Sequence, residues 1–385
     1  MTVAIYLPQI IRIGSGASNQ LADVLAELKV SKPLFITDPF MLQSGYVDRV
    51  SQSLRDASIN FGVFSECVPD PTTDSVSAGL AKWQEGDYDC VVALGGGSSI
   101  DSAKAIAVLA VHGGLMRDYK VPNPVPKSVP IIAIPTTAGT GSEATRATIV
   151  TDCETQEKML CMGIGLMPSA ALVDFELTMT MPYRLTADTG IDTLCHAMEA
   201  YVSKKASSFT DTVALASMSA VARNIRTACN EPDNSEIRET MMLAATQGGI
   251  AFSNSSVTLI HGMSRPIGAF FHVPHGMSNA MLMPAVTEYS LSGATKRYAE
   301  CACAMGFANV SDGEHRAGKL LIDGLYALNS DLGVPSPKVF GIEENEYFSL
   351  LSTMAEQALA SGSPNNNPRV PEAMDIEQLY RAVWA

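Results

Sequence analysis

Histidine and aspartate side chains in two segments of the chain could bind a divalent metal ion. The 385-residue chain has only six histidines, and three of them lie in the segment 261–275. Upstream, Asp192 and His196 are four residues apart, a spacing that places both side chains on one face of a helix. Carboxylate and neutral imidazole are ligands that zinc and ferrous iron accept. The two segments together therefore predict a site for one divalent ion.

Two turns rich in glycine and hydroxyl groups predict a second site, for a phosphate-bearing cofactor. The apolar run 88–94 leads into GGGSSID at 95–101, and the run 129–134 leads into PTTAGTGSE at 135–143. Glycine lets backbone amides approach an anion, and the N-terminus of a following helix adds a positive dipole. Ser98 or Ser99 could cap that helix. A tight turn into an ordinary helix explains the first pattern equally well, and the usual GxGxxG fingerprint is absent.

Asp38 ends a third apolar run, 32–38. A carboxylate at the end of such a strand can accept hydrogen bonds from an adenosine ribose and repels a 2′-phosphate, which favours NAD over NADP. Taken alone, an aspartate at this place is more commonly a helix cap or a turn residue.

The order of these segments predicts two domains with different folds. Residues 1–181 alternate strand-like and helix-like stretches, which indicates a Rossmann-like α/β domain with a parallel sheet and a cofactor at the carboxyl ends of its strands. Residues 182–385 lose the strand pattern, and apolar positions recur every three or four residues, which predicts an all-α domain. The expected helices span 189–202, 211–229, 237–251, 277–289, 317–332, 344–360 and 376–383.

The amino-acid composition excludes some classes of binding partner and indicates a cellular compartment. The chain is 46% hydrophobic and 17% charged, typical of a globular protein, and its net charge of −14 argues against nucleic acid or an anionic membrane as a partner. Eight cysteines without any CxxC pair indicate reduced thiols. We expect a cytoplasmic protein, because neither a signal peptide nor a membrane-spanning run is recognisable.

Seven segments together carry a resemblance to a known family: TD at 37–38, PDPT at 69–72, GGGSSIDSAKA at 95–105, PTTAGTGSE at 135–143, LTADTGIDTLCHAMEAY at 185–201, GIAFSNSSVTLIHG at 249–262 and VPHGMSNAMLMP at 273–284. In order and spacing they resemble the iron-containing (group III) alcohol dehydrogenases over nearly the whole chain. The resemblance implies a dinucleotide-binding domain, a helical domain and an active site in the cleft between them.

The resemblance also implies roles for individual residues. A divalent metal, usually Fe²⁺ and with Zn²⁺ also compatible, would be held by Asp192, His196, His261 and His275. Phe252 matches an aromatic residue near the nicotinamide, and Asp70 stands where the family commonly has asparagine. The expected NAD contacts are Asp38, Asp70, Gly96, Gly97, Ser98, Asp101, Thr136, Thr137, Thr140, Lys158 and Phe252. The family often forms homodimers or larger assemblies, so we expect a homo-oligomer.

The implied reaction is reversible hydride transfer between NAD and a small primary or secondary alcohol, with the metal binding the substrate oxygen. Besides His261 and His275, we assign catalytic roles to Arg265 and His272. Many family members have a proton-relay histidine where this chain has Arg265, and arginine cannot act as a base. The relay would run through water, the cofactor ribose or His272. Arg265 either binds a carboxylate-bearing substrate or makes a structural salt bridge.

Other functions remain compatible with the same residues. A hydroxyacid–oxoacid transhydrogenase or a maleylacetate-reductase-like enzyme would use the same two sites. A lyase resembling dehydroquinate synthase would need basic residues for a phosphorylated substrate, and no such cluster is evident near the metal segment. A non-enzymatic metal or nucleotide sensor would need a regulatory or DNA-binding segment, and none is recognisable.

Overall fold

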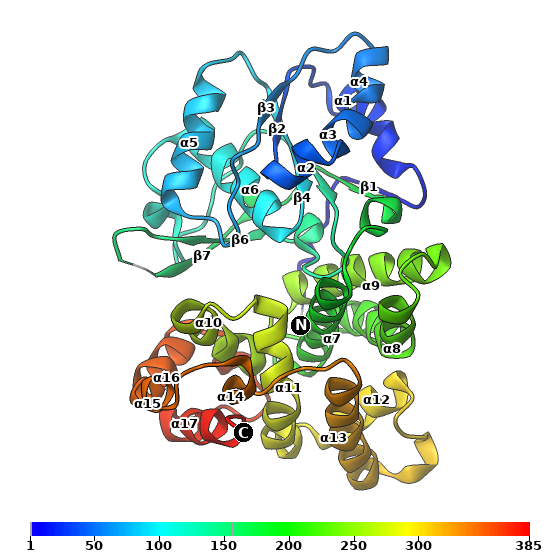
Figure 1. The fold of residues 1–385 in the computed structure, drawn as a ribbon, viewed down its shortest axis with the longest axis vertical. Helices are drawn as coiled ribbons and strands as arrows, with labels where there is room; N and C mark the ends of the chain where they lie inside the picture. The colour runs from blue at the N-terminus through cyan, green and yellow to red at the C-terminus, as the bar shows by residue number, and fades with distance from the viewer. Residues whose placement is uncertain (1, 156) are drawn as a thin grey trace. The chain divides into compact units, whose positions relative to one another are not determined.

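The computed structural model describes residues 2–155 and 157–385 and contains two compact units, Ile5–Thr180 and Met181–Ala385. Figure 1 shows a sheet with flanking helices in the first unit and helices throughout the second. The predicted combination of a parallel α/β domain and an all-α domain is confirmed.

The first unit is built on a six-stranded sheet whose strands are all parallel. In spatial order the strands are β1 (Ile10–Ile13), β8 (Ala170–Val173), β5 (Ile131–Pro135), β4 (Cys90–Gly95), β2 (Pro33–Ile36) and β3 (Gly62–Phe64). Leu94 pairs with Ile134, and Ile36 pairs with Ala93. The register therefore brings the carboxyl ends of β2, β4 and β5 to the same edge of the sheet. Asp38 follows β2, and the two glycine-rich turns follow β4 and β5.

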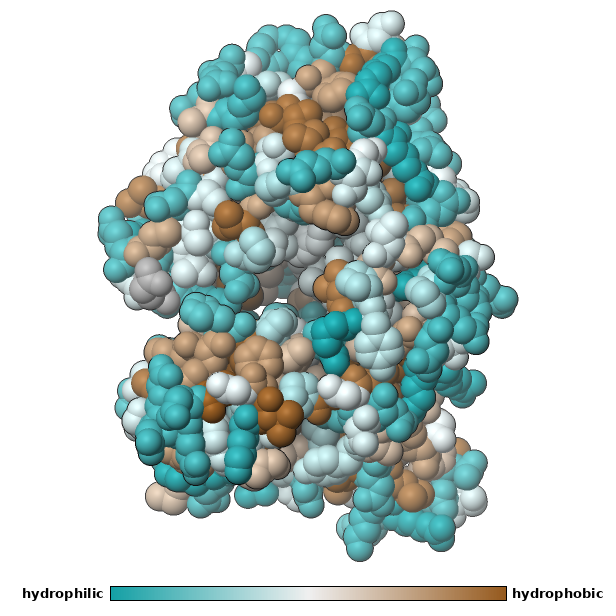
Figure 2. Space-filling model, viewed as in Figure 1, coloured by the Kyte–Doolittle hydropathy of each residue, from teal (hydrophilic) through white to brown (hydrophobic). Residues whose placement is uncertain are grey.

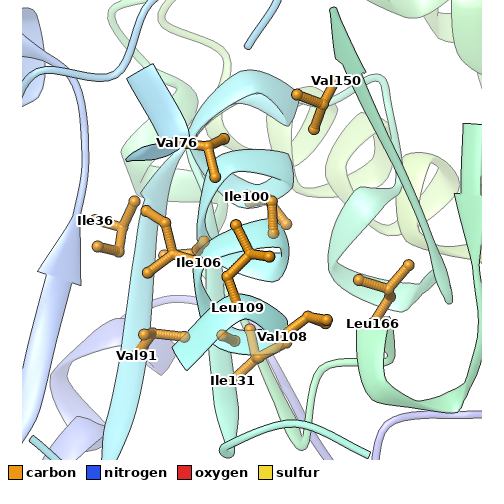
Figure 3. Close-up of a cluster of buried hydrophobic side chains, with 14 of the residues drawn as sticks. Ile36, Val76, Val91, Ile100, Ile106, Val108, Leu109, Ile131, Val150 and Leu166 are labelled. Atoms are coloured by element: carbon orange, nitrogen blue, oxygen red, sulfur yellow. The ribbon is translucent and has the colours of Figure 1, made fainter. Parts of the chain in front are cut away.

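The four inner strands, β8, β5, β4 and β2, are buried on both faces, as parallel strands usually are. Successive side chains point to opposite faces, so Leu34 and Ile36 pack with α5 (Thr73–Gln84) and α6 (Gly97–His112). Figure 3 shows this cluster around α6. Phe35 and its counterparts on β4 and β5 face the other layer, formed by α1 (Leu21–Leu28), α3 (Tyr46–Val50) and α4 (Gln52–Asp56). The short helix α2 (Pro39–Gln43) follows β2, and an antiparallel pair consists of β6 (Ala147–Thr151) and β7 (Lys158–Met162).

Helix α6 begins earlier than its sequence suggested. Its N-cap is Gly96, no side chain caps it, and Ser98 and Ser99 lie inside the first turn. The predicted serine cap is therefore wrong. A glycine at the N-cap leaves the first backbone N–H groups without a side-chain acceptor, which keeps them available to a bound anion.

The second unit contains helices and no strand among residues 181–385. Its α-helices are α7 (Tyr183–Val202), α8 (Ser208–Asn230), α9 (Ser235–Asn254), α10 (Leu259–Phe271), α11 (His275–Ser290), α12 (Thr295–Met305), α13 (Glu314–Asp331), α14 (Pro337–Phe340), α15 (Glu344–Ser349), α16 (Leu351–Ala360) and α17 (Ala373–Ala382).

Three of these helices were not predicted, and one predicted helix is divided. Helix α12 and the short helix α14 were missed, and the expected helix 344–360 is divided at Leu350 into α15 and α16. Helix α10 was missed because Gly262, Pro266 and Gly268 read as helix breakers. Packing against α11 and α16 evidently outweighs that local preference.

In Figure 2 hydrophilic residues cover much of the visible surface of each unit, and apolar residues occur in smaller groups. Within the described part of the chain, no helix combines the length and the hydrophobicity that a membrane span needs.

The buried side chain of Lys104 joins α6, which follows the first glycine-rich turn, to the loop that contains the second. Lys104 of α6 has no exposed surface, and its Nζ donates hydrogen bonds to Ser142 Oγ and Thr145 Oγ1, both at 2.9 Å, and to Ala147 O at 2.8 Å. Burial lowers the pKa of Lys104 to about 8, so the ammonium stays largely protonated at neutral pH. Helix α6 is thereby fastened to the loop after β5 and to β6.

Replacing this lysine should destabilise the first unit. Lys104→Met leaves Asp101, 4.0 Å from Lys104 Nζ, without its cation, and we expect a loss of about 3–5 kcal/mol in the free energy of unfolding. The chain has two tryptophans, Trp83 and Trp384, so Trp83 fluorescence in a Trp384→Phe background reports urea unfolding of this unit alone. The exposed Lys127→Met is the control, and equal midpoints for the two variants would contradict the prediction.

Candidate active site

Four side chains from three helices converge on one point in the helical unit. They are Asp192 and His196 of α7, His261 of α10 and His275 of α11, and one ligand atom of each lies within 4.8 Å of all the others. Asp192 Oδ1 is 3.3 Å from Nε2 of His261 and 3.7 Å from Nε2 of both His196 and His275. Tetrahedral bonds of about 2.1 Å separate ligand atoms by about 3.4 Å, so this spacing fits one divalent ion.

Helix geometry explains how these side chains meet and where the site opens. Asp192 and His196 are one turn apart on α7, while His275 is the first residue of α11. The side chains of Asp192, His196 and His261 are at most 6% exposed, whereas that of His275 is 42% exposed. A ligand can therefore reach the group from the side of His275.

Charge and burial set the protonation of the buried ligands. Burial alone would raise the pKa of Asp192, but the imidazoles of His196, His275 and His261 together hold it well below its usual value. Burial lowers the pKa of His196 to about 3 although Asp192 opposes this shift. Asp192 is therefore a carboxylate and His196 a neutral imidazole near pH 7, the forms that bind a metal.

Glu199 is a buried partner of this group that sequence reasoning missed. Its Oε2 is 2.5 Å from His261 Nδ1, and its Oε1 accepts hydrogen bonds from Thr258 Oγ1 at 2.8 Å and Ile260 N at 2.6 Å. Burial alone would lower the pKa of His261, but Glu199 and Asp192 raise it to about 9. A carboxylate on Nδ1 orients the ring so that Nε2 faces the metal. The spacing of three residues from His196 on α7 was the available signal.

Asn279 is the second residue that was missed. It lies one turn after His275 on α11 and is fully buried. Its Nδ2 donates to Asp192 Oδ1 at 2.7 Å and lies 3.1 Å from His261 Nε2 and 3.3 Å from His275 Nε2. The amide thus holds the carboxylate oxygen on which the three imidazoles converge.

The three remaining predicted residues of the helical unit differ in where they lie relative to the metal group. Phe252 stacks on His196, with ring centroids 4.3 Å apart and planes 20° from parallel, so it covers one face of a ligand. His272 lies outside the ligand group: it is exposed and caps α10 in a left-handed conformation with φ 54°. Arg265 lies on α10 one turn after His261 and makes no ion pair with any described residue, so the structural salt bridge is not found.

In the first unit, the two predicted turns approach each other closely. A Cβ atom on Gly97 would lie 2.9 Å from Thr140 Cγ2, and one on Gly96 would lie 3.4 Å from Thr137 Cγ2. Thr136 N bonds to Gly95 O at 3.0 Å. Only glycine permits this approach at position 97, and the adjoining uncapped N-terminus of α6 suits a diphosphate.

Three further predicted residues lie around these turns. Asp38 caps α2 by accepting from Met41 N at 3.0 Å, and its other oxygen is 3.5 Å from Ser99 Oγ. Asp70 N donates to Ser98 Oγ at 3.3 Å, while the Asp70 carboxylate pairs with Lys158 Nζ at 3.0 Å. Asp38 is therefore a helix cap, and it also lies at the edge of the sheet where the two glycine-rich turns lie.

Asp101 has a different environment. Its Oδ1 accepts a hydrogen bond from Ser142 Oγ at 2.8 Å, and its Oδ2 accepts one from Ile149 N at 3.0 Å. Both oxygens thus join α6 to neighbouring backbone and side chains of the unit.

Family models match both parts of the chain. The model described as "Iron-containing alcohol dehydrogenase" matches residues 8–175, and "Fe-containing alcohol dehydrogenase family, C-terminal" matches residues 186–384. The chain belongs to the iron-containing alcohol dehydrogenase family. Its expected class, an oxidoreductase acting on alcohols or aldehydes, is thereby confirmed.

Individual members of the family are similar to this chain over nearly its whole length. An NAD-dependent methanol dehydrogenase of Bacillus methanolicus is 34% identical over 98% of both chains. A crystal structure of 1,3-propanediol oxidoreductase has a TM-score of 0.95 and 32% identity, covering 100% of both chains. That of sulfoacetaldehyde reductase from Bifidobacterium kashiwanohense in complex with NAD+ has a TM-score of 0.89 and 27% identity, covering 100% of this chain and 99% of that one.

Removing the charge of Glu199 should weaken metal binding. Glu199→Gln keeps the size of the side chain but replaces the carboxylate that holds His261 Nδ1, so we expect affinity for Fe²⁺ or Zn²⁺ to fall about 10- to 100-fold. Competition with a chromophoric chelator under anaerobic conditions measures this. The exposed Glu236→Gln removes one charge from the same unit and serves as the control. Equal affinities in the two variants would refute a role for Glu199 in orienting His261.

Proposed function

We propose that this protein is a metal-dependent, NAD(H)-linked alcohol dehydrogenase or aldehyde reductase. It interconverts a small primary or secondary alcohol and the corresponding carbonyl compound by hydride transfer. The observation that carries the proposal is the group formed by Asp192, His196, His261 and His275 in a chain of the iron-containing family. A carboxylate and three imidazoles around one point fit Fe²⁺, and equally another divalent ion.

Each residue of the metal group has a definable task. When bound, the divalent ion would polarise the oxygen of the alcohol or carbonyl substrate. Asp192 supplies the negative charge, and Asn279 Nδ2 fixes its coordinating oxygen. Glu199 keeps a proton on His261 Nδ1, which leaves Nε2 as the ligand atom. The exposed side of His275 admits the substrate.

The proton of the alcohol needs a route that avoids Arg265. That guanidinium cannot act as a base, and His272 is exposed outside the ligand group. We therefore assign proton exchange to water on the open side of His275, and we assign no relay role to His272.

The first unit supplies the proposed NAD site. Backbone amides of Gly96, Gly97 and Ser98 and the N-terminus of α6 would hold the diphosphate. Thr136, Thr137 and Thr140 form the facing turn, and the Lys158–Asp70 pair borders it. The Asp38 carboxylate would bind the adenosine ribose and exclude the 2′-phosphate of NADP. Phe252, stacked on His196, is assigned to the nicotinamide.

We further infer a cytoplasmic homo-oligomer. All eight cysteines are free thiols, which supports a reducing compartment. Oligomerisation rests on the resemblance to the family alone. Size-exclusion chromatography with light scattering tests it.

Loss of one metal ligand should separate metal binding from NAD binding. His275→Ala removes an imidazole from the metal group, so we expect it to lose the ion and at least about 100-fold in activity. NAD binding should largely survive, since the residues assigned to the diphosphate and ribose lie in the other unit. Metal analysis after anaerobic purification and fluorescence titration with NADH provide the two measurements. The exposed His315→Ala is the control, and a variant that keeps its metal would overturn the ligand assignment.

Neutralising Asp38 should relax the preference for NAD. Asp38→Asn retains a side-chain oxygen to cap α2, but it removes the charge that repels the 2′-phosphate. We expect the ratio of kcat/KM for NADPH to that for NADH to rise at least about tenfold. The exposed Asp74→Asn is the control for a general change in charge. An unchanged ratio would show that Asp38 is only a helix cap.

A further inference from the structure

Arg265 is a charged side chain beside the metal group that no residue neutralises. It lies on α10 four residues after His261, so both side chains share one face of the helix. It is partly buried, and it forms no hydrogen bond or ion pair with any residue that the structure describes. A guanidinium has five N–H donors and stays charged at any ordinary pH, so this environment leaves its donors without a protein acceptor.

The carboxylate that acts electrostatically on Arg265 already forms other hydrogen bonds. Glu199 is the carboxylate that acts on Arg265 electrostatically, while burial lowers the pKa of the guanidinium. Both Glu199 oxygens, however, bind other groups: Oε2 pairs with His261 Nδ1, and Oε1 accepts from Thr258 Oγ1 and Ile260 N. Glu199 thus accepts three hydrogen bonds from other groups and forms none with Arg265.

Counting charges leaves one positive charge beside the metal group. A bound divalent ion would balance the carboxylates of Asp192 and Glu199, and Arg265 would remain unbalanced. No nitrogen of Arg265 is among the buried polar atoms that lack a partner in the described chain, so those nitrogens remain accessible to solvent. A partly desolvated, solvent-accessible guanidinium binds a planar carboxylate strongly, since two parallel N–H···O bonds can form.

We propose that Arg265 binds a carboxylate on the substrate, which makes the enzyme selective for short aldehyde acids and the matching hydroxy acids. This inference rests on the proposed function, because the carbonyl end must occupy the metal group. The carboxylate and the reacting carbonyl then lie on the same face of α10, about one helical turn apart. A neutral aldehyde of equal length leaves the guanidinium unpaired.

The test compares two four-carbon aldehydes that differ in the carboxylate. For the holoenzyme with NADH, kcat/KM is measured for 4-oxobutanoate and for butanal. In Arg265→Gln we expect the ratio of the two values to fall about 10- to 100-fold, as the loss of charge-assisted hydrogen bonds predicts. Arg265→Lys retains the charge without the fork and should give an intermediate ratio. The exposed Arg223, which forms no hydrogen bond or ion pair with any described residue, provides the control, and Arg223→Gln should keep the wild-type ratio.

A binding measurement keeps this inference separable from the proposed reaction. Succinate, an unreactive analogue with a second carboxylate in place of the aldehyde, is titrated calorimetrically into each variant. Affinity should fall at least about tenfold in Arg265→Gln and stay unchanged in Arg223→Gln. If the wild type reduces neither aldehyde, the proposed function fails, while the succinate titration still decides the role of Arg265.

Two results overturn the inference. One is equal succinate affinity and an equal substrate ratio in wild type and Arg265→Gln. The other is an unchanged ratio accompanied by weaker NADH binding in Arg265→Gln, which would assign the guanidinium to the cofactor. Thermal unfolding of the variants confirms that each compared protein is folded.

Discussion

The convergence of three imidazole nitrogens on the single buried oxygen of Asp192 is the interaction on which the helical unit depends. Burying a carboxylate is costly unless cations and hydrogen-bond donors surround it. Three helices must therefore keep their relative positions to within a few tenths of an ångström for the ligand atoms to fit one ion. Glu199 and Asn279 contribute to that rigidity, because one fixes the His261 ring and the other fixes the Asp192 oxygen. Packing among α7, α10 and α11 is thus inseparable from the chemistry that the group can perform.

The nucleotide-binding unit meets a different physical requirement: its backbone must come close to an anion. Its parallel register places the ends of β2, β4 and β5 at one edge, so that Asp38 and the two turns are neighbours. Gly97 has no room for a side chain next to Thr140, and the N-terminus of α6 has no side-chain cap. The buried ammonium of Lys104 then fastens the helix to the loop that carries the second turn. These hydrogen bonds thereby fix the uncapped N-terminus of α6 relative to the second turn.

We assign the choice of substrate to Arg265, which lies on α10 one turn after the metal-group residue His261. The relatives of this chain are named for substrates as different as methanol, 1,3-propanediol and sulfoacetaldehyde. A metal ion bound there would not by itself distinguish such molecules, because it would contact only the oxygen that reacts. Discrimination must come from side chains that face the rest of the substrate, and a charged group without a protein partner exerts the largest effect there.

The amino-acid sequence by itself determined the fold class, because that class follows from the periodicity of apolar residues. It also predicted the two glycine-rich turns from residue chemistry, and the members of the metal group from the short spacing of Asp192 and His196 together with the family resemblance. Tertiary structure alone decided what depends on contacts between distant segments. Helix α10 forms in spite of Pro266 because neighbouring helices pack against it, and Glu199 reaches His261 across 62 residues of chain. Whether Arg265 had a salt-bridge partner was likewise undecidable from its neighbours in sequence, since any acidic residue of the folded unit could have paired with it. The fold placed the carboxylate of Glu199, which acts on Arg265 electrostatically, in other hydrogen bonds and left the guanidinium without a partner among the described residues.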